Sequence, residues 1–390
     1  MEFRRIHNLP PYVFAQVDQA KVAARRAGED VVDLGFGNPD LPSPSFVVDK
    51  LTEAANKGKN HRYSSSRGLP NLRQAITDRY QRRFGVSLDP ETQAVATIGA
   101  KEGLSHLLWT LVDSGDTTVV PEPSYPIHIY APILAGSDIA RLPVVSESEY
   151  FERLEVLYRS SWPKPRVIIV SFPHNPTTTC IELSFFERLV AFAHHHGVFI
   201  VHDFAYADMH FDGYQPPSLL QVEGAAEVGV ELYSMTKGHS MAGWRMGFVL
   251  GNAPAVAALT KLKSYLDYGT FQPIQIATIV ALNSGDDYVE EVRAIYGDRR
   301  NALVDGLNNS GWKVLKPHGT MFVWAPIPEP YVEMGSVEFA LHLLREAKVA
   351  VSPGIGFGPS GDRHIRFALV ENRQRVGQAV TSMRRTLELL

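Results

Sequence analysis

Short runs of β-branched and other apolar residues alternate with longer helical patterns over most of the first 285 residues. The clearest apolar runs are 94–98, 117–120, 166–170, 198–201 and 230–233. Strands separated by helices need crossover connections, so this alternation predicts an α/β fold with a mostly parallel central sheet covered by helices. Ligands bind beyond the carboxyl ends of the strands in such sheets. The unusual polar residues of this chain follow those ends.

The regular alternation of strand and helix patterns ends at about Gly285, which indicates a second, smaller α+β lobe. A chain of 390 residues is longer than the chains that usually fold around a single hydrophobic core. The pattern predicts a long charged helix over 287–306 and another helix near 336–347. Strand candidates follow at 312–315, 321–324, 349–352 and 364–368. We interpret the proline-rich start as an arm and strand of the smaller lobe, because prolines cannot build a central helix. The expected parts are an N-terminal arm with part of the small domain (1–45), a large domain (46–285) and a small C-terminal domain (286–390).

Composition narrows the class of protein. The net charge of −4 gives no electrostatic reason to expect a nucleic acid or an anionic membrane as partner. No segment approaches the roughly 20 apolar residues of a spanning helix, and Met1–Pro11 has no apolar stretch of signal-peptide length. The single cysteine, Cys180, suits a reducing compartment, so we expect a cytoplasmic protein. We expect no metal site at His194–His196, because adjacent residues of a helix point in different directions and cannot all reach one ion.

The segment Tyr233–Arg245 carries the strongest chemical signal. Lys237 follows an apolar strand run in a loop of small residues, and Arg245 comes eight positions later. A lysine in such a place can form an imine with a carbonyl, while an arginine can hold a phosphate group nearby. These are the two groups that pyridoxal phosphate (PLP) needs from a protein.

Three further polar residues follow neighbouring strand runs and suit the ring of that cofactor. Asp203 ends an apolar run, and a buried carboxylate there needs a cationic partner such as a pyridine nitrogen. Tyr206 and Asn175 are placed to reach the ring oxygen. Each residue has a structural alternative: a helix cap for Asp203, packing for Tyr206 and a turn before proline for Asn175.

A cradle for the phosphate is predicted where the first strand run turns into a helix. The turn Gly99–Gly103 presents free backbone N–H groups at the positive end of a helix dipole. Together with Ser234 and Arg245 this turn makes a coherent anion site, since a guanidinium can grip two oxygens. Tyr125 also follows a strand run and is a candidate to stack on a flat ring, or to pack in a loop.

The chain resembles the fold-type I, class I/II aminotransferases over nearly its whole length. Six motifs in the family's order carry the resemblance: Gly35–Asp40, Tyr63–Pro70, Asn175–Thr177, Asp203–Tyr206, the lysine loop and His364–Ala368. The nearest subgroups are the alanine (glutamate–pyruvate) aminotransferases and the LL-diaminopimelate aminotransferases. Three further segments favour them: Tyr125–Tyr130, Asp267–Phe271 and Val351–Gly358.

The resemblance implies a role for each matching residue. Lys237 would bind PLP covalently and move the proton, Asp203 would pair with the ring nitrogen, and Asn175 and Tyr206 would hold the ring oxygen. The remaining cofactor contacts would be Ser234, Arg245, the backbone of Ala100 and Lys101, and the ring of Tyr125. Arg366 would grip the substrate α-carboxylate with help from Gly37 and Asn175. Tyr63 would reach the phosphate of the other subunit, which makes the active unit a homodimer. The implied reaction is transamination between amino acids and 2-oxo acids, with L-alanine and 2-oxoglutarate as the expected pair.

Departures from the family pattern leave alternatives open. Relatives often carry serine at the position of Ala100, and Gly238 and Ser240 also differ from the common pattern, but no required group is lost. The segment Leu262–Phe271 contains no arginine for a second substrate carboxylate, which argues against strict use of aspartate. The alternatives are another amino-acid or LL-diaminopimelate aminotransferase, a PLP-dependent carbon–sulfur β-lyase, and a non-catalytic PLP-binding regulator. The segment before Asn38 is too short for the DNA-binding domain of such regulators.

Overall fold

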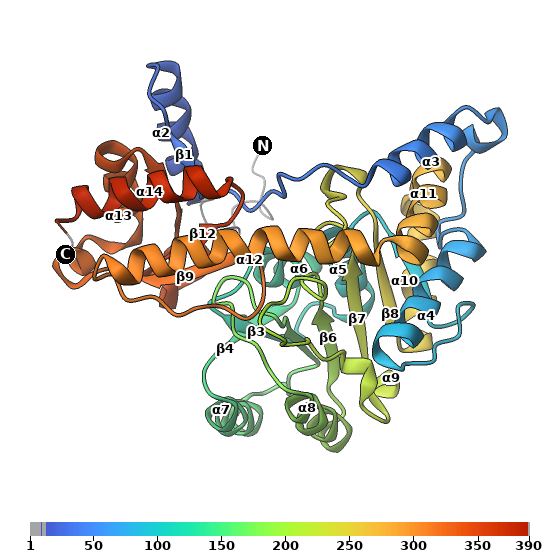
Figure 1. Ribbon diagram of the computed structural model, residues 1–390. Coiled ribbons are helices and arrows are strands. Elements are labelled where there is room, and N and C mark those ends of the chain that lie inside the picture. Colours follow the sequence, from blue (N-terminus) through green and yellow to red (C-terminus); the bar gives the residue numbers. More distant parts are fainter. Residues whose placement is uncertain (1–8, 10–12, 389–390) are drawn as a thin grey trace, which may run out of the picture.

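The structure is a computed structural model that describes residue 9 and residues 13–388. Most of Met1–Pro11, the segment inspected for a signal peptide, lies outside these residues. Figure 1 shows a large lobe built around a sheet, a smaller lobe beside it, and the long helix α12 (Asp286–Asn309) running between them. Among the described residues, no helix combines the length and the apolar character needed to cross a membrane.

The large lobe contains a seven-stranded sheet in the order β2-β8-β7-β6-β5-β3-β4. Its strands are β2 (Ala94–Thr97), β3 (Thr117–Glu122), β4 (Asp138–Pro143), β5 (Val167–Val170), β6 (Phe199–Asp203), β7 (Gly229–Ser234) and β8 (Gly247–Gly251). The strands from β7 to β4 are parallel, and β8 alone runs antiparallel to both of its neighbours. The prediction of a mostly parallel sheet is therefore confirmed. The predicted strands all end at the same edge of this sheet. The last residues of β5, β6 and β7 therefore lie together at that edge.

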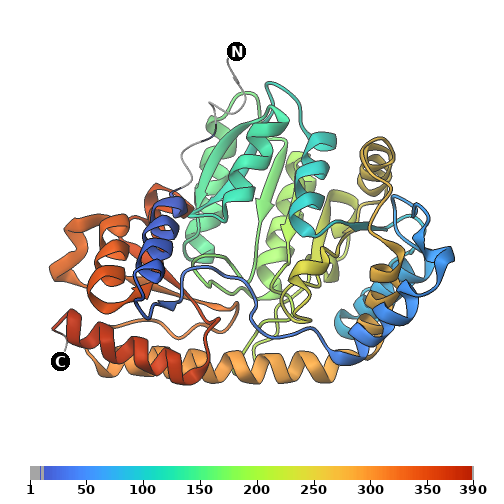
Figure 2. The same ribbon diagram turned by 90° about the horizontal axis from the view of Figure 1, so that it is seen from above.

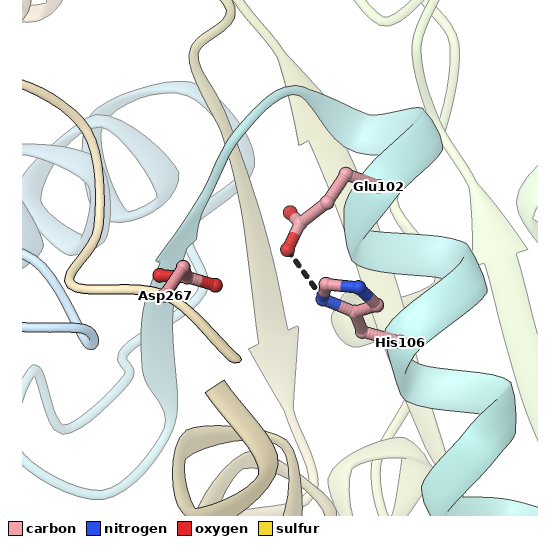
Figure 3. A group of neighbouring side chains, drawn as sticks. All are labelled: Glu102, His106 and Asp267. Atoms are coloured by element: carbon pink, nitrogen blue, oxygen red, sulfur yellow. Dashed lines mark ion pairs between the residues drawn. The ribbon is translucent and has the colours of Figure 1, made fainter. Parts of the chain in front are cut away.

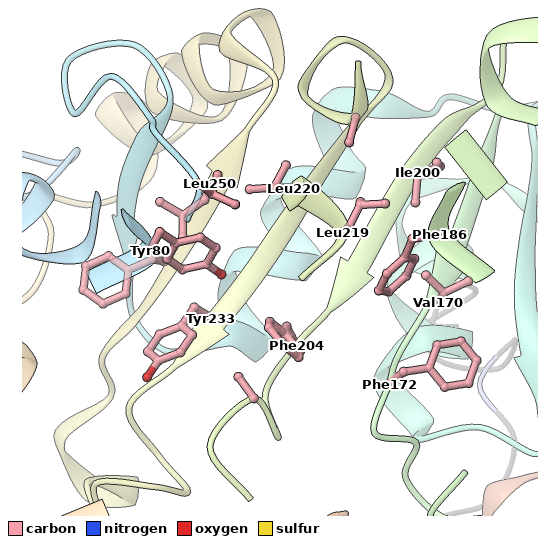
Figure 4. Close-up of a cluster of buried hydrophobic side chains, with 14 of the residues drawn as sticks. Tyr80, Val170, Phe172, Phe186, Ile200, Phe204, Leu219, Leu220, Tyr233 and Leu250 are labelled. Carbon is pink, nitrogen blue, oxygen red and sulfur yellow. The ribbon is translucent and has the colours of Figure 1, made fainter. Parts of the chain in front are cut away.

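Helices cover both faces of the sheet, because successive strand residues point to opposite sides. Val167 and Ile169 pack with one set of helices, whereas Ile168 and Val170 pack with the other. The first set is α5 (Ala100–Leu111), α6 (Pro126–Ala135) and α10 (Ala253–Leu266). The second set is α3 (Ser45–Ala55), α4 (Pro70–Phe84), α7 (Glu147–Ser160), α8 (Leu183–His196), α9 (Ala225–Val228) and α11 (Gln272–Ser284). Figure 4 shows part of the second core, where Tyr80, Phe186 and Phe204 pack beside the strands.

The small lobe has its own core and a three-stranded antiparallel sheet in the order β11-β12-β9. Its strands are β9 (Phe322–Pro326), β11 (Ser352–Pro353) and β12 (His364–Ala368), and its helices are α13 (Gly335–His342) and α14 (Arg373–Thr386). The short strand β1 (Val32–Asp33) pairs in parallel with β10 (Val349–Ala350). Figures 1 and 2 show the chain after β1 running from this lobe to α3 at the far end of the large lobe.

Four elements differ from the sequence-based expectations. The N-terminal arm contains a helix, α2 (Phe14–Arg26), whose alanine-rich sequence favours helix between the flanking prolines and Gly28. The strand predicted over 312–315 is wrong. The backbone N–H of Trp312 instead donates to the carbonyl of Leu307, and that of Val314 donates to the side chain of Asn308. These bonds close the end of α12 and leave no strand partner. The edge strand β4 and the antiparallel strand β8 were not predicted.

Candidate active site

A cavity of about 510 Å³ lies where the strand ends of the large lobe face the small lobe. Eleven of the twelve site residues expected from the sequence line it: Gly37, Ala100, Lys101, Tyr125, Asn175, Asp203, Tyr206, Ser234, Lys237, Arg245 and Arg366. The twelfth, Tyr63, is 84% exposed and its ring contacts that of Tyr268 at 4.6 Å. The structure therefore brings together residues that are up to 329 positions apart in the chain, from Gly37 to Arg366.

Lys237 lies in the loop after β7, with its amine inside the cavity. Its Nζ donates a hydrogen bond to the carbonyl of Gly37 at 2.9 Å and lies 5.7 Å from the centre of the Tyr206 ring. Burial, followed by the nearby charges of Arg366 and Arg245, lowers the pKa of the Lys237 ammonium to about 7. An amine with this pKa is available in its neutral, nucleophilic form near neutral pH.

Asp203, the last residue of β6, is buried and held by two donors. Its Oδ2 lies 2.8 Å from Nε2 of His128, and its Oδ1 accepts the backbone N–H of Ala205 at 3.1 Å. Burial alone would raise the pKa of this carboxyl, but hydrogen bonding and charge from His128 bring the pKa below its usual value. Asp203 is therefore an anion at neutral pH, ready to pair with a cation in the cavity.

His128 is a site residue that the sequence reasoning missed. It lies in α6, one helical turn after Tyr125, and its Nδ1 is 3.1 Å from Oγ of Ser124. The chain Ser124–His128–Asp203 fixes the orientation of the carboxylate from behind. The available signal was its place in the segment Tyr125–Tyr130, but helical spacing alone did not show which strand end the imidazole faces.

Asn175 connects the two halves of the cavity. Its Nδ2 donates to the hydroxyl of Tyr206 at 3.4 Å, and its Oδ1 accepts from Nη1 of Arg366 at 2.7 Å. Burial raises the pKa of the Tyr206 hydroxyl, so Tyr206 remains a neutral hydrogen-bonding group. The alternatives of a simple turn residue and a simple packing residue therefore do not describe these contacts.

The turn before α5 and the loop after β7, which were predicted to form an anion cradle, lie against each other in the structure. Gly99 has a φ of +81°, and a Cβ at this position would lie 2.3 Å from Nη2 of Arg245, so glycine allows the guanidinium to lie against the turn. Arg245 is anchored by its Nη1, which donates to the carbonyl of Ala242 at 2.9 Å. Ser234 and the first backbone groups of α5 face the same cavity. A guanidinium, a hydroxyl and a helix N-terminus together fit a phosphate group.

Arg366, on β12 of the small lobe, closes the cavity from the opposite side. Its Nη2 lies 3.4 Å from both the carbonyl of Gly35 and Oγ of Ser352. The guanidinium stacks 3.9 Å from the centre of the Phe322 ring. A Cβ on Gly37 would lie 2.6 Å from that ring, so only glycine leaves room there. A buried arginine held in this way suits a carboxylate ligand.

Two groups of histidines and acids lie elsewhere in the described part of the chain. His194 lies at the end of α8 and approaches the carbonyl of Gly224 at 3.3 Å. Glu102, His106 and Asp267 lie close enough to surround a metal ion, as Figure 3 shows. The fully buried ammonium of Lys263, however, lies 3.3 Å from Glu102 and 3.0 Å from Asp267 and already supplies their counter-charge.

The sequence model of the class I and II aminotransferases matches residues 29–382, and the chain belongs to this family. It is a PLP-dependent aminotransferase of fold type I. It is 51% identical over 382 residues to glutamate-pyruvate aminotransferase AlaC from Escherichia coli K12, covering 98% of this chain and 93% of that protein. It is 40% identical to the LL-diaminopimelate aminotransferase of Moorella thermoacetica, and the match covers 99% of this chain and 98% of that protein. The substrate-bound BacF structure from Bacillus subtilis matches with a TM-score of 0.92 at 34% identity. This match covers 100% of this chain and 98% of the BacF chain.

Proposed function

We propose that this aminotransferase moves the amino group of L-alanine to 2-oxoglutarate and so forms pyruvate and L-glutamate. The observation that carries the proposal is Arg366, a carboxylate-binding group held by Asn175 and stacked on Phe322 opposite the amine of Lys237. Every amino acid and 2-oxo acid offers a carboxylate to this arginine. The 51% identity to a glutamate-pyruvate aminotransferase supports alanine as the amino donor.

We assign the cofactor contacts to the residues that line the cavity. When bound, PLP supplies a carbonyl that receives the amino group and a ring that accepts electrons. Ser234, Arg245 and the backbone of Ala100 and Lys101 would hold its phosphate, and Tyr125 would stack on its ring. The shared cavity, the tight fit of Arg245 on Gly99 and the lowered pKa of Lys237 support this fit.

The catalytic residues act on protons and charge. In this proposal the neutral Nζ of Lys237 accepts the proton from the substrate α-carbon, because burial has lowered its pKa to about 7. Asp203, oriented by His128, keeps its negative charge facing the ring nitrogen. Tyr206 and Asn175 donate hydrogen bonds at the ring oxygen. Arg366, Asn175 and the backbone of Gly37 orient the substrate so that its α-carbon faces Lys237.

We further propose that the active unit is a homodimer in which Tyr63 reaches the phosphate site of the partner. Tyr63 is 84% exposed and its ring contacts that of Tyr268, whose chain segment carries two further exposed aromatic side chains, Tyr265 and Phe271. Exposed apolar groups of this kind favour a protein interface. The family resemblance supplies the partner, a second copy of this chain.

The domain division and the location are also proposals. The assignment of 1–45 to an arm and part of the small domain is supported by the β1–β10 pair and by Val17 in the small-lobe core. The assignments of 46–285 and 286–390 are supported by two separate cores, because the large-lobe core ends at Leu282 and the buried residues of α12 belong to the small-lobe core. The single cysteine, Cys180, supports a cytoplasmic location.

The test is a panel of half-reactions with purified holoenzyme. Each amino acid is mixed with the protein, and the conversion of the cofactor is followed by absorbance while products are identified by mass spectrometry. L-Alanine and L-glutamate should react fastest and yield pyruvate and 2-oxoglutarate. A slow reaction with alanine together with fast turnover of LL-diaminopimelate would assign the enzyme to that subgroup, which the 40% identity also keeps open. Release of ammonia from sulfur-containing amino acids would instead identify a β-lyase.

A further inference from the structure

A second cavity, of about 550 Å³, lies behind the lysine loop. It is formed by the end of α4, the first half of α12 and the chain between β6 and α9. Among the described residues, the two cavities share no lining residue. Its volume falls within the range of pockets that hold small molecules. We call it the arginine cavity because Arg79, Arg82, Arg83 and Arg293 line it.

Three carboxylates near the arginine cavity are bonded to its arginines, and a fourth, that of the exposed Glu182, also lines the cavity. Asp208 accepts from Nη2 of Arg79 at 3.0 Å and pairs with Arg83, while Asp286 accepts from Nη1 of Arg79 at 2.5 Å. Glu290 pairs with Arg293. The side chains of Asp286 and Glu290 are 67% and 69% exposed, so water screens their charge. Among the carboxylates of the described residues that pair with these arginines, Asp208 is the buried one.

The remaining hydrogen-bonding capacity of the arginines points to a missing acceptor. Within the described part of the chain, Nε of Arg293 is buried and makes no hydrogen bond. Burial, together with the charges of Arg293 and Arg83, lowers the pKa of His210 to about 3, so His210 is neutral and accepts from Nη1 of Arg293. Burial and repulsion by Arg79 and Arg293 likewise lower the pKa of Arg83 to about 10. Cations crowded in this way attract an additional anion.

We propose that the arginine cavity binds a small multivalent oxyanion, held by Arg82, Arg83 and Arg293. Guanidinium groups donate two parallel hydrogen bonds to carboxylate or phosphate oxygens, which matches this donor arrangement. The cavity also has apolar walls that admit a short carbon skeleton: Phe84, Leu183, Pro216, Pro217 and Val289. Carboxylates and phosphates share the chemistry that this site recognises.

The position of the cavity separates it from the substrate site. The hydroxyl of Tyr233 donates to Oδ2 of Asp208 at 2.5 Å, and a Cβ on Gly238 would lie 2.4 Å from the Cβ of Asp208. Asp208 therefore stands between the arginine cavity and the backbone next to Lys237. It separates an anion in the arginine cavity from the lysine loop, whereas residues of that loop line the substrate cavity directly.

The experiment is isothermal titration calorimetry of the PLP-loaded protein at fixed ionic strength. PLP occupies the phosphate cradle, so added anions cannot bind there. Citrate and pyrophosphate are titrated separately, and at least one should bind with a submillimolar Kd. Binding of citrate alone identifies a carboxylate ligand, and binding of pyrophosphate alone identifies a phosphate ligand.

Two variants decide whether the heat comes from this cavity. Arg293→Gln and Arg82→Ala each remove a charge-assisted donor and should weaken binding at least about tenfold. Arg82 is exposed, so its replacement keeps the fold. Arg384→Ala, at an exposed position on α14, is the matched control and should bind as the wild type does. Absence of binding, equal affinity in all four proteins, or an equal loss in the control overturns the proposal.

Discussion

The lowered pKa of Lys237 is a property of the site that chemical labelling can test. In the cofactor-free protein, burial and the charges of Arg366 and Arg245 lower this pKa to about 7. At pH 7 about half of the Lys237 amines are then neutral, against roughly one in 3,000 for an ordinary lysine. The larger neutral fraction outweighs the lower nucleophilicity of a less basic amine, so at equal access Lys237 should be acylated faster at pH 7 than a lysine of ordinary pKa.

The assay is competitive labelling of cofactor-free protein with acetic anhydride between pH 5 and 10. Mass spectrometry quantifies acetylation of Lys237 against an unstructured lysine peptide as internal standard. The labelling rate should rise with a midpoint near pH 7. Arg366→Gln should move the midpoint upward because it removes a neighbouring positive charge, while Arg363→Gln, at an exposed position before β12, should leave it unchanged. A wild-type midpoint above about 9 would refute the reasoning.

The same shift has a consequence for stability. The folded-state pKa lies below the unfolded value, so the unfolded chain binds more protons between about pH 7 and the ordinary lysine pKa near 10.4. The contribution of Lys237 to the free energy of unfolding therefore increases with pH across this window. Below pH 7 both states are protonated and the full destabilisation by the buried ammonium is present.

Three further predictions concern catalysis. Asp203→Asn should retain PLP but lower kcat by roughly two to three decades, because a charge pair at about 4 Å is worth on the order of 4 kcal/mol; a fall below about threefold contradicts the assignment. Arg366→Ala should weaken all amino and 2-oxo acids by about 2–5 kcal/mol in kcat/KM, and an effect confined to dicarboxylic substrates argues that the arginine reads the side chain. Tyr63→Ala and Lys237→Ala should each be impaired alone, while mixing and reassociating them should restore about a quarter of the wild-type activity, because one site in each hybrid dimer is intact. No gain on mixing places Tyr63 in its own subunit's site.

The sequence predicted the residues at the sheet edge well because parallel strands bring their ends together. Lys237, Asp203 and Asn175 each follow a short apolar run, and the order of those runs was enough to place them on one edge. These three residues come together when the neighbouring strands pair in register. The local sequence pattern was therefore enough to predict that they lie on the same edge.

Elements that depend on distant partners were not predictable in this way. β8 begins two residues after Arg245 and runs antiparallel between β7 and β2, which no crossover rule indicates. The edge strand β4 carries Asp138 and Arg141 on its exposed positions and so lacks an apolar run. The run 312–315 has strand-like residues but no strand beside it. Hydrogen-bond partners in three dimensions decided each of these cases.

The position of Arg366 shows the same limit at the level of function. Its motif could be matched to the family, but the residue lies on a separate sheet, and its position at the cavity depends on how the two lobes pack. There its guanidinium bonds to Oδ1 of Asn175, whose Nδ2 bonds to Tyr206. The groups proposed for the substrate carboxylate and for the ring oxygen thus share one amide. Moving Arg366 toward a carboxylate must change the hydrogen bonding of Tyr206, so the effects of replacing Asn175 and Arg366 should not add. The small lobe therefore helps to set the electronic environment of the large-lobe site as well as the position of the substrate.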